Sequence, residues 1–278
     1  MNRLDPTAAS PSRLHPTDPV CWPQKHSLFG VNVSATTYDE ALDVITRAAW
    51  SGLPATVDHM PVHGLVEASQ NPSLKEKINS FDLVAPDGQP VRWALNRLFG
   101  ANLPDRVYGP ELMRRLCGRA AEEGLGVFLY GSSPRTVGNL KSNLQREYPC
   151  LDVVGCESPP FRPLTEREDR ETVKRIDDSG ARLVFLGLGC PKQEIFAYQH
   201  KESIRAVQLC VGAAFDFLAG ETRMAPRWMQ DRGLEWLFRL FCEPRRLYRR
   251  YLTTNTIFVF KLARELSRSK RRHPSGYF

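Results

Sequence analysis

The 278-residue sequence lacks several features by which whole classes of protein are known. Its seven cysteines, an odd number, contain no C-x-x-C pair, which argues against a disulfide framework or a zinc site and favours reduced cysteines in a cytoplasmic protein. No apolar run reaches about 18 residues, so no transmembrane helix is expected. The glycine signatures of dinucleotide-binding and P-loop proteins are also missing. An NAD-linked oxidoreductase is therefore disfavoured.

Acidic residues are scarce in the last fifth of the chain. Residues 223–278 hold fourteen Lys and Arg but four acidic residues, a net charge of +10. The 222 residues before them hold 24 basic and 27 acidic residues, a net charge of −3. A basic end on a slightly acidic body indicates anionic partners, such as lipid head groups or a diphosphate. No nucleic acid partner is expected, because no nucleic-acid-binding motif accompanies the charge.

Short apolar runs alternate with helical patterns along most of the chain. Thr37 and Thr165 are each followed three residues later by a glutamate, and these capping boxes predict two helix starts. Strands are expected at 54–57, 82–88, 126–131, 151–155, 182–189 and 206–211. Continuous apolar strands that alternate with helices are typical of a parallel sheet covered on both faces. The sequence therefore predicts an α/β fold with a Rossmann-like, mostly parallel sheet.

The same pattern divides the chain into three parts. Residues 1–24 are rich in Pro, Ser, Thr and Asp and are expected to be disordered. Residues 25–222 are expected to form the α/β core, and residues 223–278 a basic helical appendage. In the appendage, aromatic and leucine side chains are interleaved with arginines, which is typical of a helix that lies on an anionic membrane surface. The alternative is a helix pair that packs on the core with a solvated cationic face.

Ligands of such folds bind beyond the carboxyl ends of the strands, and this rule selects a small set of residues. The set is Asp87, Gly131, Ser132, Lys192, Gln193 and Asp216. Asp87-Gly88 is a favoured turn dipeptide, although an aspartate at a strand end is also well placed for catalysis. Gly131 and Ser132 precede an expected helix, whose N-terminus either holds a phosphate or is a plain capped turn.

The other members of this set, and polar residues between positions 58 and 63, each allow more than one role. Lys192 opposes the dipole of the helix that it begins, which favours a functional role, and Gln193 suits a base edge or a sugar hydroxyl. Asp216 lies between two phenylalanines and suits a helix cap and a ligand amide equally. His59 and His63 have no further metal ligands nearby, and Asp58 and His59 are sequence neighbours that would not face each other as an acid–base pair. Solvated or capping roles are therefore expected for these residues.

Several stretches between residues 28 and 255 resemble the WecG/TagA/CpsF glycosyltransferase family. The matching stretches are Ala85–Trp93, Arg106–Leu112, Phe128–Gly131, Gly189–Glu194 and Phe215–Gly220. The most specific match runs from Arg223-Met-Ala-Pro-Arg-Trp to Glu243-Pro-Arg-Arg-Leu-Tyr-Arg-Arg-Tyr. Several collinear motifs are far harder to meet by chance than one.

The resemblance implies an inverting glycosyltransferase that moves a hexose from a UDP-sugar to a polyprenyl-diphosphate-linked saccharide in surface polysaccharide biosynthesis. UDP-N-acetylmannosamine, UDP-glucose and a uronic acid form are the donors it suggests. It implies a peripheral protein on the inner, cytoplasmic face of the plasma membrane, and it leaves a homo-oligomer open.

The resemblance also implies roles for particular residues. Asp87 matches the general base and Arg106 a conserved arginine beside it, while Gln193 and Asp216 match positions of the donor pocket. Three arginines match those with which the family's appendage neutralises the leaving UDP, so that neither a metal nor another cofactor is expected. These are Arg239, Arg246 and Arg249.

Two departures from the family pattern leave the donor sugar open. Where the family usually has a Thr-x-Asn element, this chain has His59-Met-Pro61, although a shifted alignment gives Thr56-Val-Asp58. The loop after Gly155 usually carries His, Gly and Tyr, but here it is Cys-Glu-Ser-Pro-Pro-Phe161. The first departure motivates a second hypothesis, a non-catalytic, membrane-associated assembly factor that binds a nucleotide-sugar.

Overall fold

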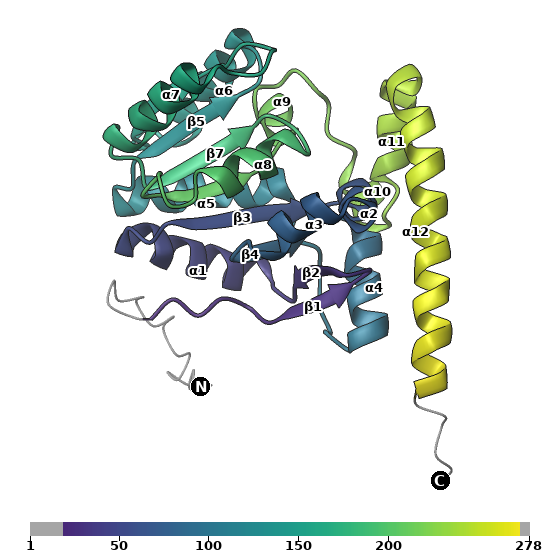
Figure 1. Cartoon of the computed structure of the whole chain (residues 1–278). Coiled ribbons are helices and arrows are strands. Elements are labelled where there is room, and N and C mark those ends of the chain that lie inside the picture. The colour runs from purple at the N-terminus through teal and green to yellow at the C-terminus, as the bar shows by residue number, and fades with distance from the viewer. Residues whose placement is uncertain (1–18, 273–278) are drawn as a thin grey trace, which may run out of the picture.

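The computed structural model describes residues 19–272, except for the side chains of Arg246 and of residues 269–272. Within this range, six strands form a parallel sheet in the order β4-β3-β8-β7-β5-β6 (Figure 1). They are β3 (Ala55–Met60), β4 (Leu83–Pro86), β5 (Val127–Gly131), β6 (Val153–Glu157), β7 (Leu183–Gly187) and β8 (Val207–Cys210). The predicted α/β class with a Rossmann-like, mostly parallel sheet is therefore confirmed.

Helices cover both faces of this sheet, as predicted. One face carries α1 (Tyr38–Ser51), α5 (Gly109–Glu123), α6 (Pro134–Glu147) and α9 (Ala214–Leu218). The other carries α2 (Val62–Gln70), α3 (Pro72–Asn79), α4 (Gln89–Phe99), α7 (Glu166–Asp178) and α8 (Lys192–Gln199). Each strand feeds both cores because its side chains alternate. In β7, Phe185 packs in the first core, and Val184 and Leu186 pack in the second.

Local sequence signals begin the helices where they were predicted to begin. The Thr37 hydroxyl accepts a hydrogen bond from the Glu40 N–H, and the Glu40 carboxylate accepts one from the Thr37 N–H, which completes a capping box. Thr165 starts α7 in the same way. Ser133 caps α6, which has Pro134 in its first turn.

The predicted strand at 54–57 is too short, and this changes the place of two polar residues. Strand β3 runs on to Met60, paired with β4 on one side and with β8 on the other. Asp58 and His59 are consequently buried, with 1% and 5% of their surface exposed. The expectation of solvated or capping roles for them is wrong, because a central strand continues through both residues.

A two-stranded antiparallel hairpin precedes the parallel sheet and was not predicted. It consists of β1 (Lys25–Leu28) and β2 (Val31–Ser34). Its valines pack into the core that contains α2 and α4, and the Ser34 hydroxyl accepts a hydrogen bond of 3.0 Å from the Val84 N–H. The hairpin thereby extends the layer that faces the C-terminal helices.

In the described part of the chain, three helices follow α9, which confirms the C-terminal helical element. They are α10 (Arg227–Asp231), α11 (Glu235–Cys242) and α12 (Pro244–Arg272). The long α12 packs against α2, α4 and α11 and stands across the end of the sheet (Figure 1). None of the described helices is both long and apolar enough to cross a membrane. The predicted domain boundaries stay predictions, and most of the segment 1–24, for which disorder is predicted, lies outside the described residues.

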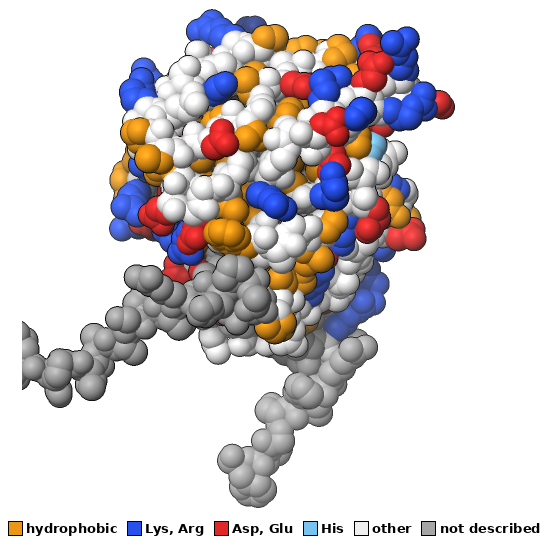
Figure 2. Space-filling view, turned by 90° about the vertical axis from the view of Figure 1, so that its left-hand side faces the viewer, with side chains coloured by type: hydrophobic (Ala, Val, Ile, Leu, Met, Phe, Trp, Pro, Cys, Tyr) orange, Lys and Arg blue, Asp and Glu red, His pale blue; other side chains and the backbone are white. Residues whose placement is uncertain are grey.

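The face of the molecule opposite α12 carries charges of both signs. Figure 2 shows Lys and Arg side chains interspersed there with Asp and Glu, without a large region of one sign. The surplus of positive charge therefore belongs to the C-terminal helices rather than to the α/β body.

Candidate active site

A pocket of about 860 Å³ lies at the carboxyl ends of the strands, beneath α11 and α12. After β3 the chain turns into α2 on one face of the sheet, and after β8 it turns into α9 on the other. Neighbouring strands whose connections diverge in this way open a crevice, where ligands of α/β folds bind. Six of the predicted site residues line the pocket: Asp87, Arg106, Ser132, Gln193, Asp216 and Arg239.

Asp87 directly follows β4 and is half-buried in the pocket wall. Loss of hydration raises the pKa of its carboxyl group to about 7, against the opposing effect of the nearby Arg106 and Arg239, and Glu235 raises it further. A carboxyl group with a pKa near 7 exchanges a proton readily at neutral pH. This property is required of a general base.

Arg106 joins the core to the C-terminal helices. Its guanidinium forms an ion pair of 2.6 Å with Glu235 at the start of α11 and donates to Gln230 of α10 at 3.2 Å. It also donates to the backbone carbonyl of Asp87 at 3.3 Å and lies over the ring of Tyr108, 4.2 Å from its centre. Arg106 therefore fixes the position of Asp87 and of α11 at the same time.

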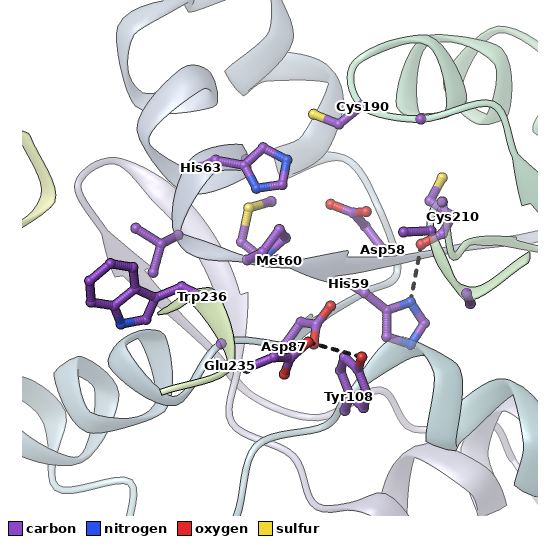
Figure 3. Close-up of a pocket in the computed structure, with 18 of the residues that line it drawn as sticks. Asp58, His59, Met60, His63, Asp87, Tyr108, Cys190, Cys210, Glu235 and Trp236 are labelled. Atoms are coloured by element: carbon purple, nitrogen blue, oxygen red, sulfur yellow. Dashed lines mark hydrogen bonds between the residues drawn. The ribbon is translucent and has the colours of Figure 1, made fainter. Parts of the chain in front are cut away.

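Glu235 is a site residue that sequence reasoning missed. Its second carboxylate oxygen accepts a hydrogen bond of 3.0 Å from the Tyr108 hydroxyl, as the dashed line in Figure 3 shows. In the sequence it counted only as one of four acids in a basic segment. The signal that could have identified Glu235 is its place beside Trp236, within the stretch that matches the family most specifically.

Ser132, Gln193 and Asp216 form a second polar wall. The Ser132 hydroxyl donates to the Asp216 carboxylate at 3.4 Å, and the Ser132 backbone has a φ of +56°, which is rare outside glycine. Such strain is concentrated at functional sites. Gln193 is buried, accepts from the Gly189 N–H at 3.2 Å and donates to Glu194 at 3.1 Å.

Gly131 has a structural role that explains its presence without a ligand. A Cβ atom at this position would lie 2.5 Å from the backbone carbon of Gly187 in the neighbouring strand. Its φ of +138° also disfavours other residues. Gly131 does not line the pocket, whereas Ser132 after it does.

Asp58 of β3 and Glu194 of α8 form a buried pair of acids at the base of the pocket. Burial raises the pKa of Asp58 well above its usual value and that of Glu194 to about 6, and the proximity of Glu194 raises that of Asp58 further. Ionisation of one carboxyl group therefore disfavours ionisation of the other. Figure 3 shows Asp58 directed toward Cys190 and His63, while the neighbouring His59 points the other way and donates from Nδ1 to the Cys210 carbonyl at 3.1 Å.

Two arginines of the C-terminal helices reach the pocket. Arg239 lies over the ring of Phe217, 5.4 Å from its centre, and Arg250 lines the same cavity. The Nε atoms of both are buried and have no hydrogen-bond partner in the described part of the chain. These donors are available for an anion.

The remaining predicted cations lie elsewhere. Arg249 and Lys192 are exposed and do not line the pocket. The side chain of Arg246 lies outside the described residues. Arg250, which was not predicted from the sequence, lines the pocket where its neighbour Arg249 was expected. The roles assigned to Arg246, Arg249 and Lys192 stay predictions.

A comparison of the chain with protein-family models gives a match over residues 26–272 to the glycosyl transferase WecG/TagA/CpsF family. The chain belongs to this family. The matched range includes α10, α11 and α12, so the helices that close the pocket are part of the family's structure. Membership indicates a glycosyltransferase, consistent with cell-surface polysaccharide synthesis, and in general terms a nucleotide-sugar donor and a lipid-linked acceptor.

The pocket of this family member contains carboxylates, but they are not grouped as metal ligands. Among the described residues, no cluster of three or more His, Cys, Asp or Glu side chains could hold a metal ion. The pocket instead brings a titratable aspartate, Asp87, close to arginines from the core and from the C-terminal helices. Metal independence stays a prediction.

Proposed function

We propose that this glycosyltransferase transfers a hexose from a UDP-sugar to a polyprenyl-diphosphate-linked saccharide, with inversion of the anomeric centre. The donor is UDP-N-acetylmannosamine, UDP-glucose or a uronic acid form, and the product serves surface polysaccharide assembly. One observation carries the proposal: Asp87, with a pKa of about 7, shares a pocket with arginine Nε groups that have no partner among the described residues.

Asp87 acts as the general base. The acceptor hydroxyl oxygen forms a bond to the anomeric carbon, on the side opposite to UDP, as the bond from that carbon to the phosphate oxygen breaks. The hydroxyl proton passes to the Asp87 carboxylate. Arg106 is a positioning residue here, because it contacts the Asp87 backbone and is itself held by Glu235.

Arg239 and Arg250 stabilise the leaving UDP. The negative charge on the departing phosphate increases as the bond breaks, and guanidinium groups already in place stabilise that charge without reorganisation. Charge-assisted hydrogen bonds from arginine to phosphate are stronger than neutral ones. This role needs side chains directed into the pocket, which is where both residues lie.

Ser132, Gln193 and Asp216 bind the nucleotide part of the donor. Asp216 supplies a carboxylate that can accept from the uracil N–H, and its contact with Ser132 orients it. Gln193 offers an amide at the edge of the same cavity. These polar residues recognise the base, while the arginines stabilise the diphosphate.

Helices α11 and α12 hold the protein on the inner face of the plasma membrane as a peripheral protein. Large apolar side chains are exposed on them, with Phe241 at 76%, Phe260 at 69% and Val259 at 63%. Exposed arginines accompany them, among them Arg245 and Arg264. Apolar side chains next to cations are typical of helices that bind anionic lipid surfaces.

A donor screen tests the proposal. Purified protein is incubated with a prenyl-diphosphate-linked saccharide and each UDP-sugar in turn, and released UDP is measured. We expect release with one donor class and, in the NMR spectrum of the product, the inverted anomer. A retained anomer would contradict the role of Asp87, and no release with any donor would favour the non-catalytic assembly factor.

A further inference from the structure

We infer that the two buried acids at the base of the pocket, Asp58 and Glu194, bind the hexose of the donor through its hydroxyl groups and select a neutral hexose over a uronate. The inference rests on the proposed function and narrows it, because it removes the uronic acid form from the possible donors. It gives these two acids a task in specificity that is separate from the tasks of the general base and of the arginines.

Each of the two acids has a carboxyl oxygen without a partner. Asp58 and Glu194 are 1% and 3% exposed, and both line the pocket. The Oδ1 atom of Asp58 and the Oε2 atom of Glu194 are buried and have no hydrogen-bond partner among the described residues. Figure 3 shows the Asp58 side chain directed toward Cys190 and His63, which line the same pocket. Because a buried acceptor without a donor destabilises the folded protein, its presence indicates that a ligand supplies the missing donor.

Asp82 shows the contrasting case of an acid that stabilises the same sheet. Its Oδ2 atom accepts a hydrogen bond of 2.8 Å from the Thr56 N–H and lies 2.8 Å from the Nζ atom of Lys201. Asp82 does not line the pocket. Asp58, two residues after Thr56 in the same strand, instead combines deeper burial with an unpartnered oxygen. The difference indicates that Asp58 serves binding rather than stability.

The order of the strands places the acids beside the reacting end of the donor. At the carboxyl edge of the sheet, β3 lies between β4 and β8. Asp87 follows β4, Asp58 lies in β3, and Asp216 lies in α9, which follows β8. A donor that reaches from Asp216 to Asp87 therefore crosses the end of β3, and the hexose is the part nearest Asp87. Glu194 adjoins the same path, because it accepts a hydrogen bond of 3.1 Å from the Gln193 amide.

The charge of this part of the pocket favours a neutral sugar. Burial raises the pKa of Asp58 well above its usual value, and the proximity of Glu194 and Asp87 raises it further. Burial also raises the pKa of Glu194 to about 6. The site therefore already disfavours negative charge, and the carboxylate of a uronate would add to it. The cations that could offset that charge, Arg239 and Arg250, hold the diphosphate in the proposed function.

A hydroxyl group meets no such obstacle. It donates to a carboxyl oxygen whether the acid is ionised or protonated, and the amide N–H of an N-acetyl group does the same. Hydrogen bonds to charged groups are also stronger than those between neutral groups. Glucose and N-acetylmannosamine are thus both compatible with the two acids, whereas the corresponding uronates are not.

Calorimetric titrations of the full-length protein, which need no turnover, test the inference. The ligands are two pairs of donors that differ only at C6: UDP-glucose with UDP-glucuronate, and UDP-N-acetylmannosamine with its uronate. For the pair whose neutral member binds more tightly, we expect that member to bind at least about tenfold more tightly than its uronate. A uronate that binds as tightly as its neutral partner in that pair would overturn the inference.

Variants of the two acids locate the preference. Asp58→Asn keeps the size of the side chain and removes its charge, so the preference for the neutral donor should fall below about threefold. Glu194→Gln should reduce the preference in the same direction. The Kd for UDP should stay within about twofold of the wild type in both variants, because UDP has no hexose. A preference that is unchanged in both variants would overturn the inference.

The matched control is Asp82→Asn, which makes the same substitution outside the pocket. It should lower Tm, because the ion pair with Lys201 is lost, and it should leave the preference for the neutral donor unchanged. Asp58→Asn should show the opposite pattern, with Tm equal to or above that of the wild type, because its unpartnered oxygen is removed from a buried site. A lower Tm with an unchanged preference in Asp58→Asn would mean that this acid only stabilises the fold.

Failure of this inference and failure of the proposed function give different results. Loss of UDP release with every donor and acceptor would refute the transferase proposal, whatever the titrations show. UDP release from a uronate donor with a kcat/KM equal to that of its neutral partner would leave the transferase proposal intact and refute the selection by Asp58 and Glu194. A kcat/KM at least about tenfold higher for the neutral donor would support it.

Discussion

The α/β core and the C-terminal helices contribute to one pocket by different physical means. All six residues of β3 are buried, so the carboxyl end of that strand is held by packing on both faces of the sheet. In contrast, the described residues of α10 and α11 include no buried side chain. Segments with few buried contacts open locally at low free-energy cost.

This difference assigns separate tasks to the two regions. The core sets the position of Asp87, and the helices bring Arg239 and Arg250 to the same pocket. Two contacts that join the regions are the ion pair between Arg106 and Glu235 and the ring contact between Phe29 and Phe258. The following predictions test this division of tasks.

The largest effect is expected from the arginines of the helices. The double variant Arg239→Gln, Arg250→Gln should lower kcat by about 10³-fold, because two donors to the leaving phosphate are lost. UDP release at saturating donor measures this. Arg249→Gln changes the neighbouring residue, which does not line the pocket. It should lower kcat by less than about threefold. An equal loss in both variants would mean that the orientation of α12 in catalysis differs from that described here.

A smaller effect is expected where the two regions meet. Glu235→Gln should reduce kcat/KM by about tenfold, because it weakens the attachment of α11 to Arg106. It should also move the acid limb of the pH profile to lower pH, since the negative charge of Glu235 raises the pKa of Asp87. An unchanged pH profile would show that Glu235 does not act on Asp87 electrostatically.

The pH dependence of the wild-type protein follows from Asp87. Its pKa is raised to about 7, so the base is deprotonated and active above that pH and protonated below it. We expect kcat/KM to be half of its plateau near pH 7 and about tenfold lower than the plateau at pH 6. A flat profile between pH 5 and pH 8 would exclude Asp87, with this pKa, as the base.

The smallest effect is expected from a change confined to the core. Thr37→Ala removes the capping box of α1 and should destabilise the fold by about 1 kcal/mol. Thermal unfolding measures this as a lower Tm. Because α1 does not line the pocket, kcat should stay the same. A change in kcat at a temperature where the variant is fully folded would contradict the separation of tasks.

Regular elements of the core could be predicted from the sequence because local rules determine them. The capping boxes at Thr37 and Thr165 and the glycine-bounded strands need no distant partner to be recognised. The end of β3 could not be predicted, since solvated or capping roles were expected for Asp58 and His59. They are tolerated in the strand because of partners far along the chain, such as Glu194 and the Cys210 carbonyl.

Site residues could be predicted where a motif places them near the end of a strand. They could not be predicted where the orientation of a helix determines which side chain faces the pocket. Asp87, Asp216 and Gln193 follow or adjoin strands and therefore reach the pocket. Arg249 and Arg250 are about 100° apart around α12, and only packing on α2 and α4 determines which one faces inward. No property of the sequence alone distinguishes them.

The most direct test of the account compares catalysis and binding in Asp87→Asn. UDP release is measured with the full-length protein, its preferred donor and a prenyl-linked acceptor, and UDP affinity is measured in parallel by calorimetry. The account predicts that release falls to background while the Kd for UDP stays within about threefold of the wild type. Release close to the wild-type rate in this variant would contradict it.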